Sequence, residues 1–208
     1  MNHPSVVWQS SKINREDRCV LNQHPSFVLW FTGLSGAGKS TLAYELERKL
    51  HEMHIRSFVL DGDNLRHGIN SNLGFSREER RENIRRAGEI SKLFVEAGIA
   101  TLASFISPFR EDREGVRARF APREFIEVYV ECPIEECARR DPKGHYKRAK
   151  EGTMKNFTGV DSDYEPPLSP EIVLRTDEQT VDQCCEAIVL YLSASGLIPR
   201  KKVSALWD

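Results

Sequence analysis

The sequence predicts an α/β fold in three layers, in which helices flank a five-stranded, mainly parallel sheet on both faces. From Ser26 onward, five short apolar segments alternate with stretches of helical periodicity, the order expected of βα units around a parallel sheet. The 208 residues, 39% hydrophobic and 29% charged, suit one globular domain. We therefore expect one domain over residues 25–208, preceded by an N-terminal extension of residues 1–24.

The composition excludes several classes of protein. The 30 basic and 31 acidic residues leave a net charge of -1, so the chain lacks the basic surface of a nucleic-acid or membrane-surface binder. The five cysteines form no CxxC pair and no zinc-like spacing, which favours free thiols in a reducing compartment. The sequence shows neither a signal peptide nor an apolar run of about 20 residues. We expect a cytoplasmic protein that binds neither nucleic acid nor membrane.

The expected elements follow from the apolar pattern. The predicted strands are residues 26–33, 55–62, 99–106, 124–131 and 170–176. Helices are predicted from Gly38–Lys39 onward, over Ser76–Ala97 with a capping box at its start, near Asp112–Phe120, near Pro133–Arg140 and over Thr180–Ser195.

Residues 141 to about 165 interrupt this alternation. They are rich in glycine, proline and charge and show no apolar period, and a long segment of this kind inside a compact domain is usually functional. We therefore predict a mobile lid. Its basic residues either form a solvated surface run or neutralise phosphates during a transfer reaction, and both interpretations stay open. They are Lys143, Lys147, Arg148, Lys150 and Lys155.

The segment GLSGAGKS, residues 33–40, matches the pattern GxxxxGK(S/T) between a predicted strand and a predicted helix, which indicates a P-loop. Glycines let the backbone turn so that N–H groups face phosphate oxygens, and the helix N-terminus adds partial positive charge. Lys39 is predicted to reach the β- and γ-phosphates, and the Ser40 hydroxyl to bind Mg²⁺. The predicted nucleotide-binding residues are Gly33, Leu34, Ser35, Gly36, Ala37, Gly38, Lys39, Ser40 and Thr41.

Two carboxylates, Asp61 and Asp63, follow the second predicted strand. They therefore lie at the carboxyl edge of the sheet, where open α/β folds bind ligands. One could hold Mg²⁺ through water and the other could accept a proton. Aspartate after a strand is also an ordinary turn former or helix cap. The neighbouring P-loop favours the catalytic interpretation.

Arginines crowd the region that follows, interleaved with Glu78, Glu79 and Glu82. For most of them, a solvated helix face with i,i+4 ion pairs is the better interpretation. Arg80 and Asn83 share one helix face, however, and could clamp an anionic acceptor. The arginines are Arg66, Arg77, Arg80, Arg81, Arg85 and Arg86.

Ser107 follows the third predicted strand at the same edge. It could be a hydrogen-bonding residue, a phosphorylation site or a turn former at the strand end, and its sequence position alone favours the turn former.

Nearly the whole chain resembles the adenylyl-sulfate kinase family. The resemblance runs from WFTGLSGAGKSTLA through LDGDNLRHGIN, LGFSREERRENIRR, FISPFREDR and DPKGHYKRAKEGTMKNFTGVDSDYE to the last helix. It implies a P-loop kinase that transfers the γ-phosphoryl group of ATP, with Mg²⁺, to the 3′-hydroxyl of adenosine 5′-phosphosulfate, giving 3′-phosphoadenylyl sulfate in sulfate assimilation. It further implies a homodimer and functional coupling to an ATP sulfurylase.

The resemblance also implies roles for particular residues. Asp63 would be the base or a metal-side carboxylate, and Phe75 and Phe157 would sandwich the acceptor adenine. Ser107 is described as phosphorylated in some members. The implied catalytic residues are Lys39, Asp63 and Ser107, and the implied metal ligands are Ser40 and Asp61. The implied substrate-binding residues are Asp61, Asp63, Asn64, Arg66, Phe75, Arg80, Asn83, Ile106, Ser107, Lys143, Asn156 and Phe157.

This chain departs from the family pattern in the lid and near the N-terminus. His145 stands where the family more often has Leu, Asp163 where it has Pro or Glu, and Gln9 where a histidine is frequent. The two lid positions concern its kinetics more than its chemistry.

Two alternatives remain. A kinase of the same fold could act on a nucleoside monophosphate or a sugar acid, but the aromatic pair Phe75 and Phe157 suits a purine better than a sugar acid. A GTP-dependent switch protein would explain the DxxG match at Asp141–Gly144. That match follows a predicted helix instead of a strand, and the sequence has no NKxD motif.

Overall fold

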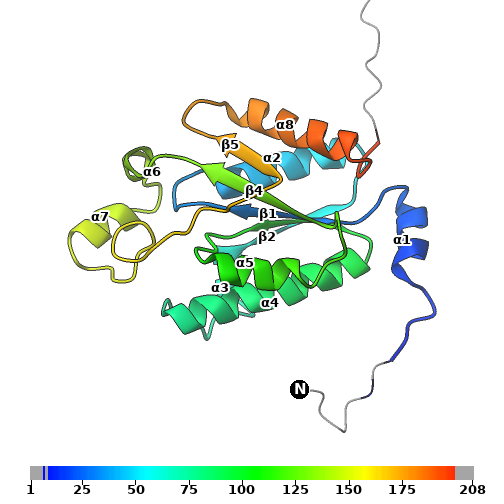
Figure 1. Ribbon diagram of the computed structural model, residues 1–208, viewed down its shortest axis with the longest axis horizontal. Coiled ribbons are helices and arrows are strands. Elements are labelled where there is room, and N and C mark those ends of the chain that lie inside the picture. The colour runs from blue at the N-terminus through cyan, green and yellow to red at the C-terminus, as the bar shows by residue number, and fades with distance from the viewer. Residues whose placement is uncertain (1–6, 8, 200–208) are drawn as a thin grey trace, which may run out of the picture.

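The computed structural model describes residues 7 and 9–199 and contains a five-stranded sheet with helices on both faces (Figure 1). The strand order is β2-β3-β1-β4-β5, and every neighbouring pair is parallel. This confirms the predicted fold class. The strands are β1 Val28–Thr32, β2 Ser57–Asp61, β3 Ala100–Ser104, β4 Phe125–Glu131 and β5 Ile172–Arg175.

Central strand β1 explains the three layers. All five of its residues are buried, as expected for a parallel strand covered on both faces. Leu29 and Phe31 belong to a hydrophobic cluster with residues of α2 (Lys39–Glu52) and α8 (Val181–Ala194). Val28 and Trp30 belong to a second cluster with residues of α4 (Arg77–Glu96) and α5 (Arg110–Arg117). The two helical layers thus cover opposite faces of the sheet (Figure 1).

The predicted helices are present, and the one expected near Asp112–Phe120 is α5, which begins at Arg110 after the extended backbone of Phe109. The remaining predicted helix is α6, Ile134–Arg140. Three further helices had not been expected from the sequence: α1 Arg15–Asn22, α3 Gly62–Arg66 and α7 His145–Lys150. Among the described residues, no helix combines the length and apolar character that crossing a membrane requires.

Helix α1 lies beside the amino ends of the strands, at the opposite end of the sheet from α6 and α7 (Figure 1). Asn14 and Asp17 form a capping box at its start. The Arg15 Nε donates to Ser26 Oγ at 2.7 Å, and Asn22 Nδ2 donates to the Gly98 carbonyl at 2.8 Å. The N-terminal extension is thus bonded to the domain. Residues 1–6 and 8 of the predicted extension and residues 200–208 of the predicted domain lie outside the described residues.

The predicted lid contains α7 and packs on the core. The Tyr146 hydroxyl donates to the Ser35 carbonyl at 3.0 Å, and the Phe157 ring meets the Tyr146 ring edge to face with centroids 4.9 Å apart. Both aromatic residues are almost fully buried. These contacts attach the lid to the loop that follows β1. The mobility of the lid stays a prediction.

Candidate active site

A cavity of approximately 910 Å³ opens at the carboxyl edge of the sheet and brings together most of the predicted site residues. One part is lined by the loop after β1 and the start of α2, and the other by the α3–α4 region, the β3–α5 loop and the lid. Asn64 does not line the cavity, because its Nδ2 turns away and donates to the Tyr44 hydroxyl at 3.0 Å. Gly33, Leu34 and Ala37, also predicted to bind the nucleotide, do not line the cavity either.

The loop at residues 33–40 takes a shape that only glycine permits at two positions. Gly33 and Gly36 have φ angles of 150° and 79°. A Cβ at Gly33 would lie 2.4 Å from the Val130 carbonyl oxygen, and one at Gly36 would lie 2.8 Å from the Cys137 carbonyl oxygen. The loop therefore packs directly on the backbone of β4 and α6, which fixes it at the N-terminus of α2.

The side chain of Lys39 folds back onto the backbone of this loop. Its Nζ donates to the Gly33 carbonyl at 2.9 Å and to the Leu34 carbonyl at 2.7 Å, and the residue is only 8% exposed. Burial lowers the pKa of Lys39 from 10.5 to about 8. An anion bound at the loop would favour the charged form again, so the site is built to receive negative charge.

The two predicted metal ligands are adjacent. Ser40 Oγ donates to Asp61 Oδ2 at 2.7 Å, and Asp61 Oδ1 accepts from the Asp63 backbone N–H at 2.9 Å as the N-cap of α3. A hydroxyl and a carboxylate are oxygen donors that suit Mg²⁺, which is usually completed by waters and substrate phosphates. The described residues hold no cluster of three or more His, Cys, Asp or Glu that could bind a metal. Ser40 and Asp61 offer the kind of oxygen donors that Mg²⁺ takes when substrate phosphates supply further ligands.

Asp63 forms an ion pair with Lys143, which reaches across the cavity from the lid. Burial raises the pKa of Asp63, but the hydrogen bond and charge of Lys143 outweigh it, so the net pKa lies below its ordinary value. Asp63 is therefore ionised at neutral pH and can accept a hydrogen bond.

Phe75 also lines the cavity and is half exposed. The Arg66 guanidinium lies 4.3 Å from its ring centroid and the Arg80 guanidinium 5.6 Å from it. Arg66 Nη1 also donates to the Leu73 carbonyl at 2.8 Å, and Arg80 Nε to the Phe75 carbonyl at 2.9 Å. The two arginines thus hold the loop that presents Phe75, which places positive charge beside an aromatic surface.

Arg80 joins this loop to the lid. Its guanidinium donates to Thr158 Oγ1 at 3.1 Å and to the Asn156 carbonyl. Between those two residues, Phe157 lines the same cavity as Phe75. The predicted aromatic pair, separated by a long stretch of sequence, therefore meets in one site.

The predicted pair of Arg80 and Asn83 lines the cavity, but the two side chains use different partners. Asn83 Oδ1 accepts a hydrogen bond from Asn70 Nδ2 at 3.0 Å, which leaves the amide N–H groups of Asn83 available to a ligand. Nothing in the sequence distinguished Asn70, which is completely buried.

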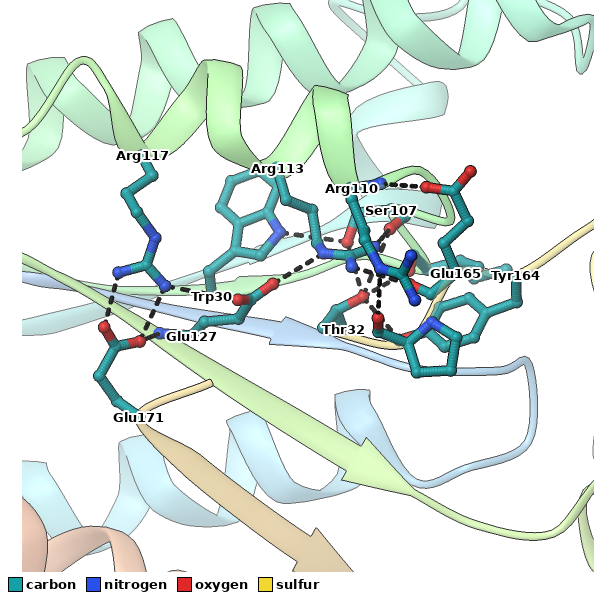
Figure 2. A network of polar contacts seen from close by, with 12 residues as sticks. Trp30, Thr32, Ser107, Arg110, Arg113, Arg117, Glu127, Tyr164, Glu165 and Glu171 are labelled. Atoms are coloured by element: carbon teal, nitrogen blue, oxygen red, sulfur yellow. Dashed lines mark hydrogen bonds and ion pairs between the residues drawn. The ribbon is translucent and has the colours of Figure 1, made fainter. Parts of the chain in front are cut away.

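Ser107 is buried, and its hydroxyl is bonded within the protein (Figure 2). The Trp30 Nε1 donates to Ser107 Oγ at 3.1 Å, and Ser107 Oγ donates to Thr32 Oγ1 at 3.0 Å. Thr32 Oγ1 in turn donates to the Ile106 carbonyl at 2.8 Å. Ile106 and Ser107 line the cavity, yet the Ser107 hydroxyl is hydrogen-bonded to Trp30 and Thr32.

Arg140 and Thr176 are among the lining residues that were not predicted. Arg140 donates to Thr176 Oγ1 at 3.2 Å and to the Thr176 carbonyl at 2.6 Å, and Thr176 Oγ1 donates to the Ala37 carbonyl at 2.8 Å. They brace the loop at residues 33–40 from the side of β5. The position of Thr176 just after a predicted strand was a usable signal, whereas nothing distinguished Arg140 from a surface arginine.

An ATP-dependent phosphotransferase of the P-loop class is defined by three features of this site. They are the glycine-rich loop, the adjacent Ser40 and Asp61, and the cavity that continues beside them. Comparison with known proteins agrees, since residues 25–175 match the family model "Adenylylsulphate kinase". The chain belongs to the adenylylsulphate kinase family, whose members phosphorylate a hydroxyl group.

Individual relatives resemble nearly the whole chain. It is 55% identical over 193 residues to a probable adenylyl-sulfate kinase of Halalkalibacterium halodurans, which covers 93% of this chain and 96% of the relative. It is also 55% identical over 188 residues to an adenylyl-sulfate kinase of Oceanobacillus iheyensis, covering 90% and 94%. The structure of the Mycobacterium tuberculosis APS kinase CysC in complex with AMPPNP and APS aligns with a TM-score of 0.78 at 42% identity, covering 82% of this chain and 99% of that one.

Proposed function

We propose that this chain transfers the γ-phosphoryl group of ATP to the 3′-hydroxyl of adenosine 5′-phosphosulfate, giving ADP and 3′-phosphoadenylyl sulfate. One observation carries the proposal: a single cavity connects the P-loop with a second region that combines Phe75, Phe157 and arginines. The names of the relatives support the same reaction, and the M. tuberculosis relative was solved with AMPPNP and APS together.

On the donor side, Lys39 would turn from the Gly33 and Leu34 carbonyls to the β- and γ-phosphates. Ser40 and Asp61 would hold Mg²⁺, which offsets charge on the phosphate oxygens. The loose transition state of phosphoryl transfer makes few covalent demands on the protein. Catalysis would therefore come from position and charge.

On the acceptor side, Phe75 and Phe157 would stack on adenine, and Arg66 and Arg80 would face the phosphosulfate anion. Asp63 would accept a hydrogen bond from the 3′-hydroxyl and orient it for attack. Because the pKa of Asp63 lies below its ordinary value, we propose an orienting carboxylate more than a strong base.

Ser107 would serve the structure and not carry the phosphoryl group. Its buried hydroxyl would have to leave Trp30 and Thr32 before it could attack ATP. Direct in-line transfer needs no such step.

We also propose a homodimer, which rests on the family resemblance. Light scattering on the purified protein should give twice the 23.8 kDa mass of one chain, and a monomeric mass at assay concentration would contradict it. Coupling to an ATP sulfurylase and a cytoplasmic location stay predictions.

The test is ADP release from ATP with adenylyl sulfate, AMP, gluconate or shikimate as acceptor. Of these four acceptors, we expect only adenylyl sulfate to give rapid release of ADP. AMP lacks only the sulfate, so comparable turnover with AMP would instead identify a nucleoside monophosphate kinase. Lys39→Met serves as the background control, because it removes the charge aimed at the phosphates.

A further inference from the structure

The end of the lid returns to the core against the loop that follows β3. The Glu165 backbone N–H donates to the Pro108 carbonyl at 2.8 Å, and the Arg110 backbone N–H donates to Glu165 Oε2 at 2.8 Å. The Glu165 carboxylate thereby caps α5, whose own N-cap residue Phe109 supplies no side-chain hydrogen bond. We call residues 107–110 and 164–166 together the lid joint (Figure 2).

Arg113 lies at the centre of the lid joint and is almost completely buried. Its Nη1 donates to the Ser107 carbonyl at 2.6 Å and its Nη2 to the Glu165 carbonyl at 2.8 Å. Its Nε donates to Glu127 Oε1 of β4 at 2.7 Å. One planar guanidinium thus ties the β3–α5 loop, the lid and the sheet, a task that the single Nζ of lysine cannot perform.

The loop held by Arg113 is strained. Ser107 has a φ angle of 40°, which residues other than glycine adopt only where the surroundings impose it. The Ser107 carbonyl is held by Arg113, and its hydroxyl is held by Thr32, which is also 3.1 Å from the Tyr164 hydroxyl of the lid. The shape of the loop therefore depends on the end of the lid.

We propose that Arg113 is a positioning residue that joins the β3–α5 loop and the end of the lid into one unit and so sets the affinity for adenylyl sulfate. Arg113 does not line the cavity, but Ile106 and Ser107 of the loop that it holds do, and so does Phe157 of the lid. None of its three acceptors lies in the P-loop. The proposal rests on the function proposed above for this site.

The test uses two matched substitutions. Arg113→Lys keeps the positive charge beside buried Glu127 and loses the two carbonyl contacts. Arg117→Lys is the control: Arg117 also pairs with Glu127, at 3.4 Å, but its other partners are Glu171 and Phe125, and it touches neither the loop nor the lid. Tyr164→Phe removes only the hydroxyl next to Thr32 and preserves the ring.

For Arg113→Lys we expect KM for adenylyl sulfate to rise about tenfold, because buried carbonyls lose charge-assisted hydrogen bonds. KM for ATP and kcat should change less than about twofold, since the P-loop is not involved. Tyr164→Phe should produce a smaller rise, and Arg117→Lys none. An equal rise in both arginine variants, an unchanged KM in Arg113→Lys, or a fall in kcat alone would overturn the proposal.

A second measurement does not depend on activity. The amide hydrogens of Arg110 and Glu165 cross the lid joint, so their exchange with deuterium reports its integrity. We expect faster exchange at both amides in Arg113→Lys and wild-type exchange in Arg117→Lys. Unchanged exchange in Arg113→Lys contradicts the proposal. If the wild-type protein fails to phosphorylate adenylyl sulfate, the proposed function is wrong, and the exchange result still decides the role of Arg113.

Discussion

The two halves of the cavity are built in different ways. The donor half is a run of consecutive residues, 33–40, whose glycines fit directly against the backbone of β4 and α6. The acceptor half is assembled from the loop before α4, the β3–α5 loop and the lid, and side chains such as Arg80 and Arg113 join these segments. The donor half therefore takes its shape from adjacent residues, although Tyr146 of the lid also bonds Ser35, whereas the acceptor half includes the lid itself. Substitutions should affect one half without the other.

The largest expected effect is on the donor half. Lys39→Met should lower kcat/KM at least about a hundredfold, because a charge aimed at the developing phosphate charge is lost. The same substitution should raise the midpoint of thermal unfolding without nucleotide. Burial holds the pKa of Lys39 at about 8 in the folded chain against 10.5 unfolded, so the buried charge opposes folding below pH 8 and this penalty fades between pH 8 and 10.5.

Lys49→Met is the control for Lys39→Met. Lys49 lies on the same helix but pairs with Asp182 outside the cavity, and its loss should leave activity unchanged. Near-normal turnover by Lys39→Met would contradict the assignment of the P-loop.

The second largest effect is expected at Asp63, which lines the cavity and pairs with Lys143 of the lid. Asp63→Asn keeps the shape of the side chain and should lower kcat about a hundredfold while ATP affinity stays the same. Stopped-flow single turnovers separate binding from the chemical step. If kcat survives and only KM for adenylyl sulfate rises, Asp63 binds the acceptor and does not orient its hydroxyl for reaction.

The acceptor half is tested most cleanly by Phe75→Ala. Phe75 is 52% exposed, so its loss should cost little stability, whereas Phe157 is 6% exposed and packs on Tyr146. Loss of one stacking face, worth about 1 to 3 kcal/mol, should weaken adenylyl sulfate binding about tenfold and leave ATP binding unchanged.

Calorimetric titration of each ligand measures both affinities of Phe75→Ala. Phe58→Ala, at a residue 48% exposed on β2 and outside the cavity, is the matched control. An equal loss of affinity for ATP would show that the two halves are not separable.

The pH dependence of ATP binding sharpens the same contrast. Because the pKa of Lys39 is about 8 before binding and phosphates raise it, binding takes up a proton above pH 8. ATP affinity should therefore fall about tenfold between pH 7 and 9. Calorimetry in two buffers of different ionisation enthalpy counts the protons. Lys39→Arg should abolish the uptake, and the same uptake in that variant would assign it to another group.

The smallest effect is expected at Ser107. Ser107→Ala should retain activity within about threefold, because direct transfer needs no serine. Its stability should fall by about 1 to 3 kcal/mol, since the buried Trp30 N–H loses its acceptor. Urea unfolding and steady-state assays measure the two quantities. Isolation of a phosphoserine that passes its label to adenylyl sulfate at the turnover rate would reverse this conclusion.

The sequence predicted the donor half more fully than the acceptor half for a physical reason. Gly33–Ser40 carries its geometry in adjacent residues, so its motif can be recognised without the rest of the chain. Arg113 gave no such signal, because in REDREGVR it resembles any surface arginine until the fold places three acceptors around it.

The missed helices have local causes. Helix α1 is short and has no buried residue, although its capping box at Asn14 and Asp17 was legible. Helix α3 has five residues, too few to show a period. In α7 only Tyr146 is buried, so the lid showed no apolar period despite containing a helix.

We propose that the cavity presents the 3′-hydroxyl of adenylyl sulfate, and no other hydroxyl, to the γ-phosphate of ATP. Nuclear magnetic resonance of the purified product shows which hydroxyl received the phosphoryl group, through the coupling between phosphorus and ribose protons. We predict one new phosphate monoester coupled to the 3′ proton, formed in equal amount with ADP. A new phosphate on the 2′ position, or ADP formed without any new phosphate on adenylyl sulfate, would contradict this proposal.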